Sequence, residues 1–254
     1  MLNGLIKSLF KSKSVIPTPI GLPLNHRLYC IGDIHGRLDL LTAVHEKIAK
    51  DTATSNSINT LIYLGDYIDR GRDSKLVVDC LLADSFPDFK KVYLLGNHEQ
   101  VLLKFLGGAN PANAYDWFKF GGLSTLLSYG VKVIGIPIAK DLEQLRNDFL
   151  ENLPATHWDF FNTLTLSYET EDYYFVHAGI RPKVKLQQQQ IEDQLWIREE
   201  FLNSPLFHGK IIVHGHTVTK EPLFLPNRIG LDTGAYSSGN LTCAVFENCN
   251  CRIL

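Results

Sequence analysis

Carboxylates, imidazoles and an amide recur in five short motifs spread along the chain. The motifs are GDIHG at residues 32–36, GDYIDRG at 65–71, GNHE at 96–99, HAG at 177–179 and HGHT at 214–217. Their oxygen and imidazole ligand atoms suit Mn, Fe or Zn, and an arginine among them suits an anion. One motif alone also fits a solvated turn, a surface ion pair or a helix N-cap, but five together do not. The combination predicts metal-assisted hydrolysis of a phosphate ester.

Metal ions can accelerate this reaction, which is very slow in water. Phosphate monoesters resist water so strongly that enzymes accelerate their hydrolysis by up to about 10²¹-fold. Two ions ~3.5–4 Å apart can hold the attacking and leaving oxygens and make a bridging water acidic enough to attack. A carboxylate shared by both ions offsets their repulsion, and we assign this role to Asp66.

The composition is that of an ordinary globular protein. The 254 residues carry a net charge of -2, so no basic field predicts a nucleic-acid partner. We expect a cytoplasmic protein with reduced thiols, because the five cysteines contain no Cys-x-x-Cys pair. No apolar run reaches the ~20 residues of a membrane-spanning helix.

The first three motifs each follow an expected strand. Strands at 28–31, 60–64 and 91–95 alternate with helices at 38–49 and 74–82. This order predicts parallel strands with right-handed crossovers. The motifs therefore lie beyond the carboxyl ends of strands, where open α/β sheets bind their ligands.

The rest of the chain divides into three parts. Residues 1–26 are expected to be an N-terminal extension and a proline-containing linker before a single domain at 27–254. Within that domain, glycines and aromatic residues indicate a mostly helical cap at about 107–166. Strands expected at 173–176, 210–213, 228–231 and 241–246 form a second set, which delivers the last two motifs.

Taken together, these motifs resemble the phosphoprotein phosphatase family of the calcineurin-like metallophosphoesterase superfamily, in its bacterial and phage branch. The resemblance spans roughly residues 27–246. It implies an α/β fold in which two mixed β-sheets pack as a sandwich flanked by helices, with a helical cap insertion. It also implies dephosphorylation of phosphoproteins on serine or threonine, with tyrosine as a further option, by direct attack of a hydroxide that bridges two divalent ions. Mn²⁺ is expected, with Fe or Zn as alternatives.

The resemblance also carries over roles to individual residues. The first metal would be held by Asp33, His35 and Asp66, and the second by Asp66, Asn97, His177 and His216. His98 would protonate the leaving oxygen, Asp69 would orient its ring, and Arg70 would bind the phosphate. The segment LWIRE at 195–199 points to Arg198 as a second phosphate ligand, with Arg181 as the competitor.

The substrate is less constrained than the reaction. Residues 231–236 read LDTGAY where eukaryotic members have a Ser-Ala-Pro-Asn-Tyr loop, so eukaryotic subunit docking does not carry over. The sequence leaves open whether Tyr236 still faces the active site. The principal alternative is a symmetrical diadenosine tetraphosphatase, and Asp69, Arg70 and Glu99 favour the phosphoprotein phosphatase over it. A non-enzymatic metal-binding scaffold is a distant alternative. The expected partner is a phosphoprotein or phosphopeptide.

Overall fold

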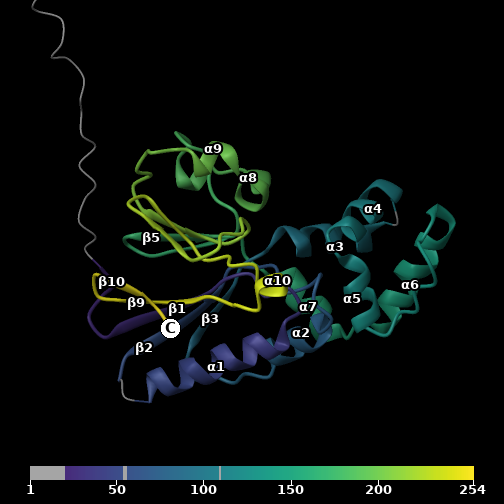
Figure 1. Cartoon of the computed structure of the whole chain (residues 1–254), viewed down its shortest axis with the longest axis horizontal. Coiled ribbons are helices and arrows are strands. Elements are labelled where there is room, and N and C mark those ends of the chain that lie inside the picture. The colour runs from purple at the N-terminus through teal and green to yellow at the C-terminus, as the bar shows by residue number, and fades with distance from the viewer. Residues whose placement is uncertain (1–20, 54–55, 109) are drawn as a thin grey trace, which may run out of the picture.

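Two five-stranded sheets organise the molecule (Figure 1). The computed structural model describes residues 21–53, 56–108 and 110–254. Residues 1–20 of the expected N-terminal extension lie outside the described residues, and the boundaries at 26 and 27 stay a prediction. No helix within the described ranges is both long and apolar enough to cross a bilayer.

The first sheet contains the expected β-α-β-α-β unit. Its order is β10-β9-β1-β2-β3. Strands β1, β2 and β3 are parallel to one another, β9 is antiparallel to β1, and β10 is antiparallel to β9. The elements are β1 (His26–Ile31), α1 (Leu38–Thr52), β2 (Ile58–Tyr63), α2 (Ser74–Leu82), β3 (Lys90–Tyr93), β9 (Cys243–Glu247) and β10 (Asn250–Ile253).

The expected strand at 241–246 lies in the first sheet and not, as predicted, in the second. Residues 241–246 were expected to join the second set of strands, but β9 pairs with β1, where Tyr29 lies opposite Val245. β9 runs antiparallel to β1 and lies between β1 and the edge strand β10.

The second sheet has the order β4-β5-β6-β8-β7 and is also mixed. Its inner strands β5, β6 and β8 are parallel, and its edge strands β4 and β7 are antiparallel. The elements of this half are β4 (Ser167–Glu169), β5 (Tyr173–Val176), α8 (Ile191–Trp196), α9 (Glu199–Leu202), β6 (Ile211–His214), β7 (Leu223–Leu225), β8 (Arg228–Gly230) and α10 (Ala235–Ser238). The predicted fold of two mixed sheets with flanking helices is confirmed.

Alternation along each strand divides the core into layers. In β1, Leu28 and Cys30 pack between the sheets against Phe175 and Val213, whereas Tyr29 and Ile31 face the helices that cover the first sheet. On the outer face of the second sheet, Val176 and Ile212 pack under α8 and α9 in a third apolar cluster. Figure 1 shows the same arrangement, with α1 and α2 below one sheet and α8 and α9 above the other.

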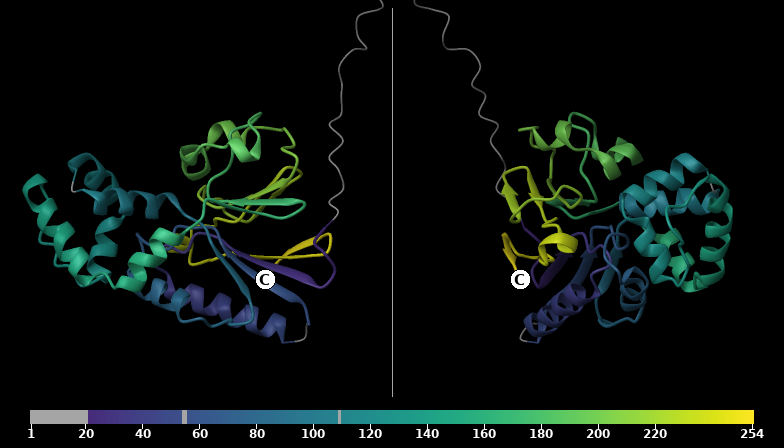
Figure 2. Two further views of the ribbon diagram at one scale, coloured as in Figure 1. Left: turned by 180° about the vertical axis from the view of Figure 1, so that it is seen from behind. Right: turned by 45° about the vertical axis from the view of Figure 1, so that its right-hand side comes forward.

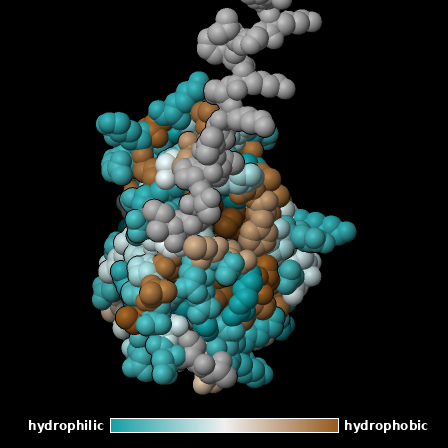
Figure 3. Space-filling model, turned by 90° about the vertical axis from the view of Figure 1, so that its left-hand side faces the viewer, coloured by the Kyte–Doolittle hydropathy of each residue, from teal (hydrophilic) through white to brown (hydrophobic). Residues whose placement is uncertain are grey.

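Helices fill the segment between β3 and β4 and gather at one end of the sandwich (Figure 2). They are α3 (Asn97–Gly107), α4 (Pro111–Lys119), α5 (Gly122–Ser128), α6 (Leu142–Asn152) and α7 (Ala155–Thr163). The buried aromatic rings of Trp117, Phe149 and Phe161 join this end to the main core. The opposite end of the sandwich is mostly hydrophilic, with apolar residues visible near its middle (Figure 3).

Candidate metal centre and catalytic site

The predicted ligands are buried where the motif loops leave the strands. Asp33 and His35 follow β1, Asp66 follows β2, and His177 follows β5, each with 2% or less of its surface exposed. Asn97 opens α3, separated from the end of β3 by three residues, and His216 follows β6. Burial of this many polar side chains is costly unless each finds a partner.

The backbone of these loops is unusual where the side chains must converge. Five predicted site residues have a positive φ, a region that non-glycine residues rarely adopt and that recurs at functional sites. They are His35, Asp66, Asp69, Arg70 and His216. Two glycines are required by close approach, because a Cβ would lie 2.1 Å from Asp66 Oδ1 at Gly96 and 2.0 Å from Asp33 Oδ1 at Gly215.

Asp66 lies at the centre of the predicted ligands. His35 Nε2 is 3.6 Å from Asp66 Oδ2, and His177 Nε2 is 3.5 Å from Asp66 Oδ1. Two groups of ligand atoms suited to a metal share this carboxylate: Asp66 with His35 and His98, and Asp66 with His177 and His216. The structure thus brings together most members of both predicted sets around the residue assigned to bridge them.

Asn97 and Asp33 complete the cluster in different ways. The Oδ1 atom of Asn97 is 2.8 Å from His177 Nε2 and 2.9 Å from His216 Nδ1. Asp33 accepts the backbone N–H of His216 at 3.0 and 3.2 Å. Burial and the neighbouring charges of Asp232 and Asp66 raise the pKa of Asp33. A cation would offset the repulsion between the carboxylates of Asp33 and Asp66.

The protonation of two histidines provides the test of whether a cation fits. His35 Nδ1 lies 2.9 Å from the carbonyl of Ile68, and His177 Nδ1 lies 2.8 Å from the carbonyl of Leu64. A carbonyl can only accept, so each Nδ1 carries the hydrogen and a neutral ring presents an Nε2 lone pair to Asp66. Burial lowers the pKa of both rings, to about 3 for His35. Lone pairs that face a carboxylate repel it, and a divalent ion between them would turn repulsion into coordination.

His98 differs from the other imidazoles, because its pKa is raised. Its Nδ1 is 2.7 Å from Asp69 Oδ2. Burial disfavours the charged ring, but the carboxylates of Asp66 and Asp69 outweigh burial and raise the pKa. The Nε2 atom lies 3.4 Å from Arg70 Nη2. Two such donors facing each other suit an anionic oxygen placed between them.

Two residues from the helical segment hold Asp69, and sequence reasoning missed both. Trp117 in α4 donates its indole N–H to the Asp69 carboxylate at 3.0 and 3.1 Å. Thr125 in α5 donates its hydroxyl to Asp69 Oδ1 at 2.5 Å. The aromatic content of this segment indicated packing, and no motif marked either residue. The helices therefore supply the groups that orient the partner of His98.

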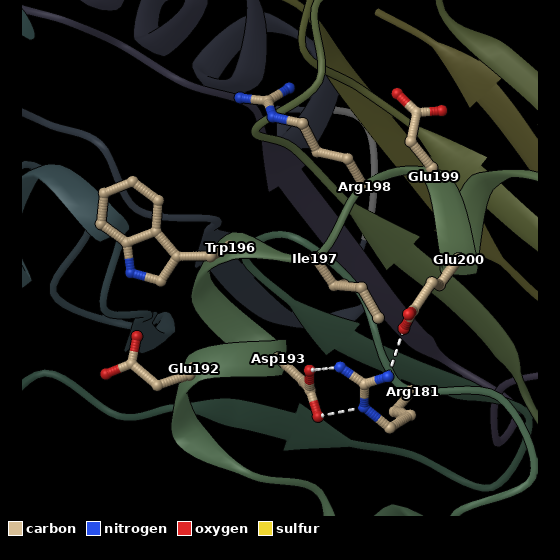
Figure 4. A pocket seen from close by; sticks show the side chains of 8 residues that line it. All are labelled: Arg181, Glu192, Asp193, Trp196, Ile197, Arg198, Glu199 and Glu200. Atoms are coloured by element: carbon tan, nitrogen blue, oxygen red, sulfur yellow. Dashed lines mark hydrogen bonds and ion pairs between the residues drawn. The ribbon is translucent and has the colours of Figure 1, made fainter.

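The structure distinguishes the two candidate arginines (Figure 4). Arg181 makes a bidentate contact with Asp193 at 2.6 and 2.8 Å and also contacts Glu200. Arg198 extends away from that group and donates to the Thr217 hydroxyl at 3.1 Å, beside the predicted ligand His216. The positive charge of Arg198 also helps to lower the pKa of His216, after burial and the charge of His177.

Glu99 organises the backbone of the second and third motifs. Its Oε2 accepts the N–H groups of Asp66 at 2.9 Å and Gly96 at 3.1 Å, and its Oε1 accepts those of Tyr67 at 2.8 Å and Ile68 at 3.3 Å. The carboxylate is fully buried. Since both oxygens accept two donors each, Glu99 holds the loop that presents Asp66.

Replacing Glu99 by glutamine is expected to lower Tm and weaken Mn²⁺ binding. The amide of glutamine must turn its NH₂ toward two backbone N–H groups whichever way it lies, leaving buried donors without acceptors. At ~1–3 kcal/mol for such a loss, Tm should fall by ~3–10 °C. Thermal unfolding and Mn²⁺ titration calorimetry measure both effects. Exposed Glu143→Gln in α6 is the control; equal behaviour of the two variants would contradict the role of Glu99.

Comparison with known proteins places this geometry in a wider group. The family model for calcineurin-like phosphoesterases matches residues 26–246. The chain is 27% identical over 235 residues to the asymmetrical bis(5'-nucleosyl)-tetraphosphatase PrpE of Anoxybacillus flavithermus, covering 84% of this chain and 87% of the relative. The Bacillus subtilis PrpE, of the same name, is 26% identical over 234 residues, with the same coverage.

Two solved structures share the fold. The crystal structure of a candidate diadenosine tetraphosphatase has a TM-score of 0.57 at 21% identity, covering 94% of this chain and 95% of that one. A mutant cold-active protein tyrosine phosphatase has a TM-score of 0.61 at 15% identity, covering 96% of this chain and 86% of that one. At these identities, the likeness concerns the fold alone.

Proposed function

The chain belongs to the calcineurin-like phosphoesterase family, and from this premise we propose that it is a metal-dependent hydrolase of bis(5'-nucleosyl) tetraphosphates. The observation that supports this substrate class is the match to the PrpE tetraphosphatases over nearly the whole of both chains. The sequence motifs alone favoured phosphoproteins and placed tetraphosphates second, and in the symmetrical form. The relatives support a tetraphosphate substrate over a phosphoprotein, and their name specifies the asymmetrical tetraphosphatase.

The predicted ligands are suited to two divalent ions. We propose Asp33, His35 and Asp66 for one ion and Asp66, Asn97, His177 and His216 for the other. Bound ions would polarise a phosphate oxygen and supply a water acidic enough to attack phosphorus. The buried, neutral imidazoles and the shared carboxylate of Asp66 support this assignment.

His98, Asp69 and Arg70 would act on the phosphate itself. In its charged form His98 donates Nδ1–H to Asp69, and its Nε2–H, which lies 3.7 Å from Asp66 Oδ2, would donate to the leaving oxygen. Arg70 lies beside His98 Nε2 and would hold a phosphate oxygen, with Arg198 as a second anion ligand. Trp117 and Thr125 keep the Asp69 carboxylate in place, so the proton is delivered from a fixed position.

Dephosphorylation of phosphoproteins remains the second candidate. It is favoured by the contact of Asp69 with His98 at 2.7 Å beside Arg70. Asp69 and Arg70 are among the residues by which the sequence resembles phosphoprotein phosphatases more than symmetrical tetraphosphatases.

Comparing substrates under saturating Mn²⁺ tests the proposal. Diadenosine tetraphosphate is expected to give AMP and ATP. Its kcat/KM should exceed that for phosphoserine, phosphothreonine or phosphotyrosine peptides by at least ~10-fold. A contact worth about 1.4 kcal/mol provides this ~10-fold discrimination. Chromatography of the products gives the cleavage position, and two molecules of ADP would indicate the symmetrical reaction instead. A preference for the peptides would replace the proposal by the second candidate. The His98→Asn variant is the control for contaminating hydrolases.

A further inference from the structure

An exposed aromatic ring lies beside the first phosphate arginine. The Tyr236 ring centroid is 4.5 Å from the Arg70 guanidinium carbon, and Tyr236 is 40% exposed. The same ring contacts His35 edge-on at 5.5 Å. Arg37 fixes the backbone next to Tyr236, because it donates to the carbonyl of Ala235 at 2.8 Å. Tyr236 therefore faces the site despite the departure of its loop from the eukaryotic pattern.

A second ring accompanies the second arginine. Trp196 precedes Arg198 by two residues, and Figure 4 shows both side chains extending to the same side, away from Arg181. The indole contacts the ring of His216 at 6.2 Å and that of Phe120 at 5.6 Å. Both Trp196 and Arg198 line a hollow of about 520 Å³.

Most charges around this hollow are already paired. Arg181 binds Asp193 and Glu200, and Lys104 lies 3.6 Å from Glu192. Arg198 has no carboxylate within ion-pair distance among the residues of the described ranges. Its guanidinium is thus available to an anion, next to an uncharged aromatic surface.

A phosphate attached to a nucleoside matches each arginine–aromatic pair. A guanidinium binds phosphate oxygens, and an aromatic ring stacks on any nucleobase. The two rings contact different predicted metal-ligand groups, His35 for Tyr236 and His216 for Trp196. A substrate held at the metals could reach one pair with each of its ends.

We propose that the Arg70–Tyr236 pair and the Arg198–Trp196 pair each bind one nucleoside phosphate end of a bis-nucleosyl polyphosphate. The inference rests on the proposed function and extends it, because it assigns the nucleobases to particular rings. Phe120 supports the Trp196 ring and also contacts His98 at 5.7 Å.

Competition between two inhibitors tests the rings without using the proposed substrate. AMP and inorganic phosphate are compared as inhibitors of p-nitrophenyl phosphate hydrolysis with Mn²⁺. Wild-type protein should bind AMP about 10-fold more tightly than phosphate, the value of one stacked base. Each single variant, Tyr236→Leu or Trp196→Leu, leaves one pair for AMP, so the double variant should remove this advantage, and Tyr236→Phe should retain it. Trp158→Leu, which removes an indole that is 41% exposed on α7, should leave the ratio unchanged.

The dinucleotide then tests whether both pairs act together. For diadenosine tetraphosphate, each leucine variant should lose about 10-fold in kcat/KM relative to p-nitrophenyl phosphate, the value of one stacked base. The double variant should lose ~100-fold, because separate sites add. If AMP has no advantage over phosphate, or keeps it in the double variant, the nucleoside sites are refuted even when the dinucleotide is hydrolysed. If the dinucleotide is not hydrolysed but the AMP advantage depends on a ring, the substrate proposal fails and the nucleoside site stands.

Discussion

Replacing His98 by asparagine is expected to lower kcat by ~10²–10⁴, the usual contribution of a general acid. Asparagine can still hydrogen-bond to Asp69 but has no proton to give to the leaving oxygen. The loss should be larger for phenyl phosphate than for p-nitrophenyl phosphate, because the more basic phenolate depends more on protonation. Steady-state kinetics with both esters under saturating Mn²⁺ measure the difference.

A matched variant and a pH profile separate this role from a structural one. His157 is also buried and lies 2.9 Å from Asp79, so His157→Asn removes a comparable pair outside the site and should leave the ratio of the two esters unchanged. Asp69 raises the pKa of His98, and the ring must be protonated to act. Asp69→Asn should therefore move the alkaline limb of kcat to lower pH. An equal loss for both esters in His98→Asn would rule out proton donation.

Replacing Asp66 by asparagine is expected to empty at least one metal position and reduce activity by several orders of magnitude. The substitution removes the one carboxylate that both ligand groups share. Metal content after dialysis against Mn²⁺, measured by elemental analysis, should fall from two ions to one or none.

Asp232→Asn is the comparison for this experiment. Asp232 is a buried carboxylate that accepts the N–H of Gly234 at 2.8 Å and belongs to neither ligand group. It should retain two ions. Two fully occupied positions in a crystal of the Asp66→Asn protein would refute the bridging role, whatever the activity of that variant.

Local sequence patterns predicted the first strands and the first helix. The short apolar runs at 28–31 and 60–64 and the helical spacing in 38–49 were enough to place β1, β2 and α1 within a few residues. The parallel order of β1, β2 and β3 followed from the helices between them, because a crossover of that length allows few other arrangements. From this order alone, the first three motifs had to meet beyond the carboxyl ends of neighbouring strands.

Other features depended on contacts between distant segments. Short strands such as β4, β7 and β10 have three or four residues each, and their pattern is too brief to separate from a loop. The place of β9 beside β1 depends on which sheet edge its side chains complete, which no local signal encodes. The contacts of Trp117 and Thr125 with Asp69 join residues 48 and 56 positions apart.

Residue types and their spacing at strand ends thus indicated metal-assisted hydrolysis of a phosphate ester, because parallel strands bring their carboxyl ends to one edge. The metal ligands and the proton donor were predicted from the family resemblance of the same motifs. Only the tertiary structure decided which arginine is available, since Arg181 is bound by Asp193 and Glu200 and Arg198 is not. It alone also placed Tyr236 on Arg70 and Trp196 beside His216. The physical reason is that a side chain's role in recognition depends on what neutralises and surrounds it, and those neighbours come from elements far apart in the chain.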